Sequence, residues 1–277
     1  MEVTLWGVRG SIPTPGPGTL RYGGNTACVE VRGAEGGILI LDAGTGLRRL
    51  GEAVRPADRR LDILLTHLHV DHILGLGFFA PLDEPDVEIH IWGPAAGHDD
   101  LRSRLARYLS PPLSAVGLRD FHGRLSFHTV PAGCFEVSGF RVTADYVCHP
   151  GPTFGYRIVE RDSTVCYLPD HEPALAAGGR FDAPEWMSGF DLAKDATLLI
   201  HDAQYSSEEY PARRGWGHST LSHAIALAQL ARAEQLVSFH HDPGHDDAAL
   251  DLLLARAEPP AGPLRCVVGG EGMHFTL

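Results

Sequence analysis

The stretch Leu61–His72, LDILLTHLHVDH, combines a short apolar run with a dense cluster of polar side chains. The apolar residues Ile63, Leu64 and Leu65 predict a buried strand. Directly after them the chain carries His67, His69, Asp71 and His72. Imidazole and carboxylate groups are ligands that zinc and similar divalent ions accept. We therefore expect a metal site where this strand ends, rather than a polar loop that happens to be rich in histidine.

The spacing of these side chains suits two ions. His67 and His69 lie two residues apart in an extended segment and point the same way. Asp71 and His72 are adjacent and must diverge, so they could serve a second ion close to the first. The motif H-x-H-x-D-H after an apolar strand resembles the signature of the metallo-β-lactamase fold hydrolases. The presence of both Asp71 and His72 resembles the two-zinc branch of that family.

Strands and helices alternate in both halves of the chain, and several strands end in ionisable residues. This pattern favours an α/β (α+β) architecture, an αββα sandwich of two sheets covered by helices. We expect residues 1–277 to form one domain of two ββα-type halves, with the metals along the edge between the halves. The resemblance implies the same fold.

Composition and charge limit the classes of molecule that the protein could bind. The chain has 277 residues, of which 44% are hydrophobic and 21% charged, as in an ordinary globular protein. Its formal charge of −12 disfavours long nucleic acid, because proteins that bind it usually carry a basic face. The chain has small clusters of arginines, such as that at 102–107. We interpret them as solvated surface rather than as a surface that binds the phosphates of a nucleic acid. Without a membrane-spanning stretch or a signal peptide in the sequence, we expect a cytoplasmic protein.

The five cysteines are scattered and contain no C-x-x-C pair. That argues against a disulfide framework and against a zinc site made of cysteines. Cys148 is next to His149, but we expect it to be a buried apolar thiol. Residues 7–25 form a loop dense in glycine and proline. This loop is either a plain connection between strands or a wall of the site that carries Arg9, Ser11, Tyr22 and Asn25.

Later strands also end in ionisable residues. His149 follows the strand 140–147, Asp170 follows the strand 164–168, and His240 and His241 follow the strand 235–239. The first cluster lacks a third ligand for its first ion, and His149 is placed to supply it. His171 and Glu172, next to Asp170, are weaker candidates that could simply begin a helix. Asp42 follows the strand 37–41. In the metallo-β-lactamase fold hydrolases that the motif resembles, an aspartate at this place supports the ligand-bearing loop.

The resemblance becomes more specific in the C-terminal half. The segments LLIHDAQY, GHST and LVSFHHDP look like the corresponding segments of tRNase Z and its relatives. We favour His240 over His241 because the strand leads directly into it and the family's histidine falls there. The ligand set that the resemblance implies is His67, His69 and His149 for one ion, Asp71, His72 and His240 for the other, and Asp170 as the bridge. Zinc is the expected metal, although manganese and iron also suit such ligands.

Two neighbouring ions can share a hydroxide and lower its pKa toward neutrality. That hydroxide would attack a phosphodiester, and Asp71 could also accept a proton. His218 is the candidate general acid for the leaving alkoxide, and Asp202 could orient it. The alternative for His218 is a residue that caps the following helix. The pair of Asp202 and His218 favours a phosphodiesterase, because lactone and thioester hydrolases of the fold are not expected to share it.

The substrate is the more open question. In tRNase Z the arm that grips tRNA is a long insertion between the third histidine and the bridging aspartate. Here His149 and Asp170 are only 21 positions apart. We therefore expect a small phosphodiester such as a cyclic nucleotide, by analogy with the phosphonate-pathway and cyclic-nucleotide phosphodiesterases of this fold. The cysteine-rich zinc site of the phosphonate-pathway enzymes has no counterpart here.

Four alternatives stay open at this point. They are a lactone or thioester hydrolase, a tRNase Z-like endoribonuclease, a nucleotide-binding module without activity, and a redox di-iron protein. The last is least favoured, because such members of the fold usually carry an acidic residue where His69 stands. By analogy with this branch we also expect a homodimer.

Overall fold

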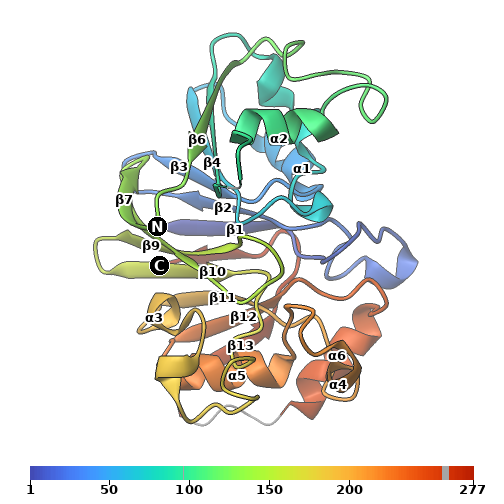
Figure 1. Ribbon diagram of the computed structural model, residues 1–277, viewed down its shortest axis with the longest axis vertical. Coiled ribbons are helices and arrows are strands. Elements are labelled where there is room, and N and C mark those ends of the chain that lie inside the picture. Colours follow the sequence, from blue (N-terminus) through green and yellow to red (C-terminus); the bar gives the residue numbers. More distant parts are fainter. Residues whose placement is uncertain (96, 258–261) are drawn as a thin grey trace.

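Three apolar clusters divide the chain into layers. The largest lies between two sheets and includes Leu5, Leu41, Phe140, Tyr156 and Phe239, all essentially inaccessible to solvent. A second cluster lies between the first sheet and the helices that cover it. A third lies between the second sheet and its helices. Figure 1 shows this arrangement of two central sheets with helices above and below. The predicted αββα sandwich is confirmed.

Both sheets are mixed and have seven strands. The structure, a computed structural model, describes residues 1–95, 97–257 and 262–277. The first sheet has the order β14 (His274–Thr276), β1 (Glu2–Gly7), β2 (Cys28–Arg32), β3 (Ile38–Leu41), β4 (Arg60–Leu64), β5 (Glu88–Gly93) and β6 (Arg124–Thr129). The second has the order β13 (Arg265–Val268), β12 (Gln235–Phe239), β11 (Leu198–Asp202), β10 (Ser163–Leu168), β9 (Phe154–Glu160), β8 (Phe140–Tyr146) and β7 (Gly133–Val137).

The helices pack on the outer faces of the sheets. They are α1 (Gly46–Ala53), α2 (Leu101–Tyr108), α3 (Phe190–Ala193), α4 (Tyr210–Arg213), α5 (Leu221–Leu230) and α6 (Asp247–Arg256). Buried leucines of α1 and α2 join the cluster outside the first sheet, and those of α3 and α5 join the cluster outside the second. Partly buried Leu253 and Leu254 of α6 pack against the cluster outside the second sheet. In the residues described, no helix is long and apolar enough to cross a membrane.

The direction of the strands determines where the polar residues meet. Strands β3 to β6 pair in parallel, and so do β10 to β13. The carboxyl ends of parallel strands lie at the same edge of a sheet, which is where α/β proteins usually bind ligands. The histidine-rich segment follows β4, while Asp170, Asp202 and His240 end or follow β10, β11 and β12. The fold therefore collects the predicted ligands along one edge of the sandwich.

The sequence predicts a helix beginning at 73–79 and, from the apolar spacing of Leu101, Leu105 and Leu109, another over 95–109. The structure differs at both. The segment 73–79 is not a helix but lies in a series of short 3-10 turns, Val70–His72, Leu76–Phe78 and Ala80–Asp83. Gly75 and Gly77 interrupt it, and Pro81 follows it, since glycine and proline disfavour a helix interior. The helix expected over 95–109 begins only at Leu101, because the side chain of Asp100 caps it through the backbone N–H of Ser103. Its expected residue 96 lies outside the described residues.

The sequence predicts an alanine- and leucine-rich helix that is capped at Ser219 or Thr220 and runs to about residue 234. Helix α5 begins there but ends earlier. The side chain of Thr220 accepts a hydrogen bond from the backbone N–H of His223, as an N-cap residue does. The helix ends at Leu230 rather than near residue 234, because Arg232 adopts a left-handed backbone conformation (φ 56°).

Candidate active site

Asp42 supports the histidine-rich segment from the end of β3. Its buried carboxylate accepts hydrogen bonds from the backbone N–H of Thr66 (2.7 Å), from the Thr66 hydroxyl (3.0 Å) and from the Tyr167 hydroxyl (3.0 Å). Nδ1 of His72 lies 2.8 Å from the same carboxylate. Such a partner fixes the orientation of the ring and leaves Nε2 free to bind a metal. Asp42 thus contacts the loop but does not join the ligand groups.

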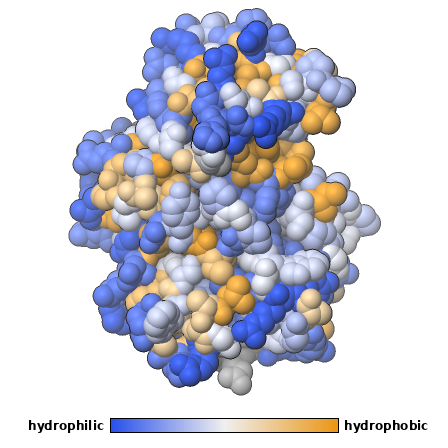
Figure 2. Space-filling view, viewed as in Figure 1, coloured by the Kyte–Doolittle hydropathy of each residue, from blue (hydrophilic) through white to orange (hydrophobic). Residues whose placement is uncertain are grey.

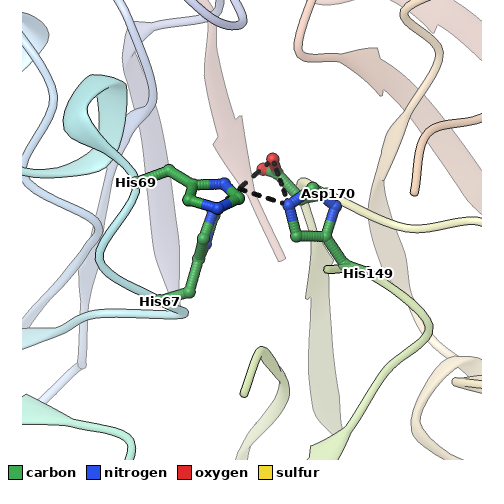
Figure 3. A group of neighbouring side chains, drawn as sticks. All are labelled: His67, His69, His149 and Asp170. Atoms are coloured by element: carbon green, nitrogen blue, oxygen red, sulfur yellow. Dashed lines mark hydrogen bonds and ion pairs between the residues drawn. The ribbon is translucent and has the colours of Figure 1, made fainter. Parts of the chain in front are cut away.

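Four side chains gather at the first predicted ligand set. Ligand atoms of His67, His69, His149 and Asp170 all lie within 4.8 Å of one another. Figure 3 shows His67 and His69 facing His149 and Asp170 from the opposite sheet. Nε2 of His149 lies 3.1 Å from Nδ1 of His69 and 3.6 Å from Oδ2 of Asp170. The segments after β4 and β8 therefore meet across the sandwich edge.

The second predicted set lies directly beside the first. Asp71, His72 and His240 also bring their ligand atoms within 4.8 Å of one another. Nε2 of His240 lies 3.1 Å from Oδ2 of Asp71, and Nε2 of His72 lies 3.0 Å from Oδ1 of Asp170. Asp170 therefore faces one set with each of its carboxylate oxygens, as a bridging ligand would.

The polar atoms at the centre fit metal ions. Nε2 of His67, Nε2 of His72 and Oδ1 of Asp170 are buried and have no hydrogen-bond partner among the described residues. A buried polar atom without a partner is costly, so such groups usually bind an ion or an ordered water. The donor set of imidazoles and carboxylates is one that zinc, manganese and iron accept.

Hydrogen bonds also fix the ring nitrogens of His149 and His240 that point away from the centre of the site. Nδ1 of His149 donates to the carbonyl of Gly217 (2.9 Å), and Nδ1 of His240 donates to Oε1 of Gln204 (3.0 Å). His241, by contrast, turns away from the centre, and its Nε2 lies 2.8 Å from the carbonyl of Gly269. His240 therefore lies within a ligand group and His241 lies outside those found among the described residues.

Asp202 and His218 form a pair next to the ligand sets. Nδ1 of His218 lies 2.6 Å from Oδ2 of Asp202. The other oxygen of Asp202 accepts from the backbone N–H groups of Ser219 (2.9 Å) and Gln204 (3.0 Å). The ring of His218 stacks on that of His240, with centroids 5.0 Å apart. His218, Asp170 and His240 also form a third group of neighbouring ligand atoms.

The charges of this cluster shift the pKa values of its members. Burial lowers the pKa of His149 to about 4. Burial opposes ionisation of Asp170, yet the neighbouring histidines 240, 72 and 67 hold its pKa well below the usual range. Neutral imidazole and ionised carboxylate are the forms that bind metals. Burial also lowers the pKa of His218, but Asp202 outweighs it and raises the pKa to about 9. Bound cations would oppose this rise, because they add positive charge nearby.

The glycine- and proline-rich loop contributes to the site at one point. The backbone N–H of Ser11 donates to Oδ2 of Asp71 (2.7 Å). At Gly10 a Cβ atom would lie 2.3 Å from Nδ1 of His240, so only glycine allows this approach. Arg9 is fully buried and donates to the carbonyls of Gly23 and His245. The loop is thus both a wall of the site, through Ser11, and a structural connection.

Two other residues of that loop serve to anchor it. The hydroxyl of Tyr22 donates to Asp251 (2.7 Å), and the side chain of Asn25 donates to Glu271 (3.0 Å). Both contacts join the loop to the C-terminal part of the chain, away from the ligand sets.

The weaker candidates do not join the ligand groups. Nδ1 of His171 lies 2.9 Å from Nε2 of His201, in a buried pair beneath the site. Cys148 is half-buried and belongs to none of the ligand groups found among the described residues. Neither His171 nor Glu172 begins a helix.

Glu172 has a role that sequence reasoning missed. Its buried carboxylate accepts from the Tyr210 hydroxyl (2.7 Å) and from the backbone N–H groups of Gly215 (3.0 Å) and Gly217 (2.9 Å). Gly217 in turn accepts from His149 and precedes His218. Only its position next to Asp170 could have drawn attention to Glu172, because its partners lie about 40 residues away along the chain.

Comparison with known proteins agrees with this geometry. The family described as "Beta-lactamase superfamily domain" matches residues 38–241. Ribonuclease Z of Listeria innocua is 28% identical over 235 residues, 69% of this chain and 74% of that protein. Ribonuclease Z of Anoxybacillus flavithermus is 25% identical over 302 aligned positions, 93% of this chain and 92% of that protein.

Among solved structures, the metallo-β-lactamase fold protein YhfI of Bacillus subtilis superposes with a TM-score of 0.72. It is 19% identical, and the match covers 99% of this chain and 98% of that one, which shows the shared fold. The family match spans most of the chain, and it includes every predicted ligand. The chain therefore belongs to the beta-lactamase superfamily.

Proposed function

We propose that this protein hydrolyses a phosphodiester with two divalent metal ions, of which zinc is the expected species. His67, His69 and His149 would hold one ion, Asp71, His72 and His240 the other, and Asp170 would lie between them. When bound, two such ions lower the pKa of a shared water and neutralise charge on the phosphoryl oxygens. Support comes from the two adjoining ligand groups and from the buried unpaired atoms that face each other there.

The contact between Asp202 and His218 is the observation that carries the proposal. Because Nδ1 of His218 is engaged by Asp202, Nε2 is the nitrogen left to give a proton to the leaving alkoxide. Its ring lies against that of His240, so a group bound at the ions would be within its reach. Asp71 is the proposed acceptor of the proton from the attacking nucleophile.

We propose a small phosphodiester as the substrate and a cyclic nucleotide as the class to test first. The segment between His149 and Asp170 contains only the hairpin of β9 and β10, which closes at Arg161 (φ 54°). A hairpin of this size has no spare length for an arm that could grip tRNA. The net charge of −12 also disfavours a long polyanion.

Cleavage of precursor tRNA is the second candidate. Two relatives that carry the name ribonuclease Z align with most of this chain at 25–28% identity. A long nucleic acid would then have to bind without an arm between His149 and Asp170, through other surfaces of the protein.

One panel of substrates separates the candidates. Zinc-loaded protein is offered bis(p-nitrophenyl) phosphate, 2′,3′- and 3′,5′-cyclic nucleotides, a tRNA transcript with a 3′ extension, a lactone and a thioester. Turnover of the small diesters without cleavage of the transcript supports the proposal. Cleavage of the transcript at the end of the acceptor stem supports the second candidate. Turnover of a lactone or thioester alone would overturn both.

Three further predictions stay with this proposal. We propose that residues 1–277 act as one domain, that the protein is a homodimer, and that it works in the cytoplasm. Light scattering of the purified protein tests the dimer, and fractionation of the source cells tests the location.

A further inference from the structure

A cavity of about 330 Å³ opens beside the first ligand set. His67 and His69 line it, so any group in the cavity lies next to the metal centre. Arg104 and Arg107 of α2 form one wall, and residues 150–152, which follow His149, form another. The volume is in the range of pockets that hold small molecules.

The wall formed by α2 is positively charged. Arg104 and Arg107 are three residues apart on a helix, so their side chains leave the same face. No carboxylate lines the cavity in the part of the chain that the structure describes. Figure 2 shows strongly hydrophilic side chains over the region of α2 and an apolar band below them. The two neighbouring guanidinium groups therefore make this wall locally positive, although the chain as a whole has a net charge of −12.

Both arginines have donors to spare. Nη2 of Arg104 donates to the carbonyl of Pro94, while its Nε is buried and has no partner among the described residues. Arg107 pairs with Asp99, but these side chains are 73% and 48% exposed. Exposed ion pairs contribute little to stability, so Arg107 could exchange Asp99 for a ligand.

We propose that this cavity binds a second phosphate of the substrate, which Arg104 and Arg107 recognise. Guanidinium groups suit this task because their fixed N–H groups match the oxygens of a phosphate. The inference rests on the proposed function and narrows its substrate class. A cyclic mononucleotide has one phosphate, whereas a cyclic dinucleotide or a linear nucleotide phosphorylated at a second hydroxyl has two.

Two chromogenic probes test the inference. One is the 5′-(p-nitrophenyl phosphate) of thymidine, and the other is the same compound with an added 3′-phosphate. The zinc-loaded full chain should show a kcat/KM about tenfold higher for the second probe, mainly through a lower KM; a tenfold ratio corresponds to about 1.4 kcal/mol. Arg104→Gln and Arg107→Gln should each remove most of that preference, and Arg107→Lys should restore part of it.

Arg102→Gln is the matched control. It removes the same charge from the same helix, but Arg102 is exposed and does not line the cavity. It should keep the wild-type preference. Equal turnover of both probes by the wild type, or a preference that survives both cavity substitutions, overturns the inference and leaves the proposed function standing. No turnover of either probe overturns the proposed function and the inference with it.

Discussion

The carboxylate of Asp202 lies 2.6 Å from Nδ1 of His218, and both side chains are buried beside the two ligand sets. Backbone N–H groups of Ser219 and Gln204 hold the other oxygen of Asp202, so the carboxylate cannot turn away from the ring. The arrangement leaves Nε2 of His218 available to a substrate that binds at the two ligand sets. This contact joins β11 to the loop before α5 and is the basis of the first prediction.

Replacing His218 by alanine should lower kcat most for substrates with a poor leaving group. General acid catalysis contributes roughly 10²–10⁴-fold, and an alkoxide needs the proton far more than p-nitrophenolate does. We expect a loss in that range for a cyclic nucleotide and a much smaller loss for bis(p-nitrophenyl) phosphate. Steady-state kinetics on both substrates measure it, with metal content as the control. Equal losses on the two substrates would rule out the acid role.

Glu172→Gln should destabilise the loop that carries His218. The amide of glutamine has one acceptor oxygen in place of two, so it cannot accept from the Tyr210 hydroxyl at one position and from the N–H groups of Gly215 and Gly217 at the other. Leaving a buried donor unsatisfied costs about 1–3 kcal/mol, and urea unfolding measures this loss. Glu208→Gln, at an exposed position on a neighbouring loop, should stay within about 0.5 kcal/mol of the wild type. A similar effect of both substitutions would contradict the role of Glu172.

The adjacent histidines 240 and 241 should respond differently to alanine. His240→Ala removes a side chain that lies 3.1 Å from Asp71, so the protein should lose about one metal ion per chain. His241→Ala should keep the metal content but lower stability by about 1–3 kcal/mol, because the buried carbonyl of Gly269 loses its donor. Elemental analysis of the two variants decides between them. Metal loss in the His241 variant alone would reverse the assignment.

Asp42→Asn should weaken metal binding without removing a ligand. The new amide can no longer accept from the Thr66 N–H, the Tyr167 hydroxyl and His72 together, so His72 loses its fixed orientation. Loss of such a partner typically lowers metal affinity 10–100-fold. Zinc titration against a competing chelator measures the change. Tyr167→Phe removes one of the donors but spares His72, and an equally large loss there would contradict this explanation.

Much of the site could be predicted from the sequence because its ligands follow strands. His67, His69, Asp71 and His72 occupy one short segment after an apolar run, and that local pattern needs no knowledge of the fold. His240 was harder to separate from His241, since both follow the same strand. The resemblance favours His240, and in the structure His240 lies 3.1 Å from Asp71 while His241 contacts the carbonyl of Gly269.

The features that the sequence did not indicate depend on contacts between distant residues. Glu172 binds N–H groups more than 40 positions away, and the cavity pairs α2 with the segment after His149. The helix predicted over 73–79 failed for a local reason, because Gly75 and Gly77 favour short turns over a continuous helix. Apolar spacing alone does not reveal such turns.

Metal content per chain tests the central claim most directly. The protein is purified without chelator, loaded with zinc, freed of excess metal and measured by elemental analysis. The two ligand sets joined by Asp170 predict about two ions per chain, falling to about one in the His240→Ala variant. A wild-type chain that retains no metal under these conditions would contradict the account of a two-metal phosphodiesterase.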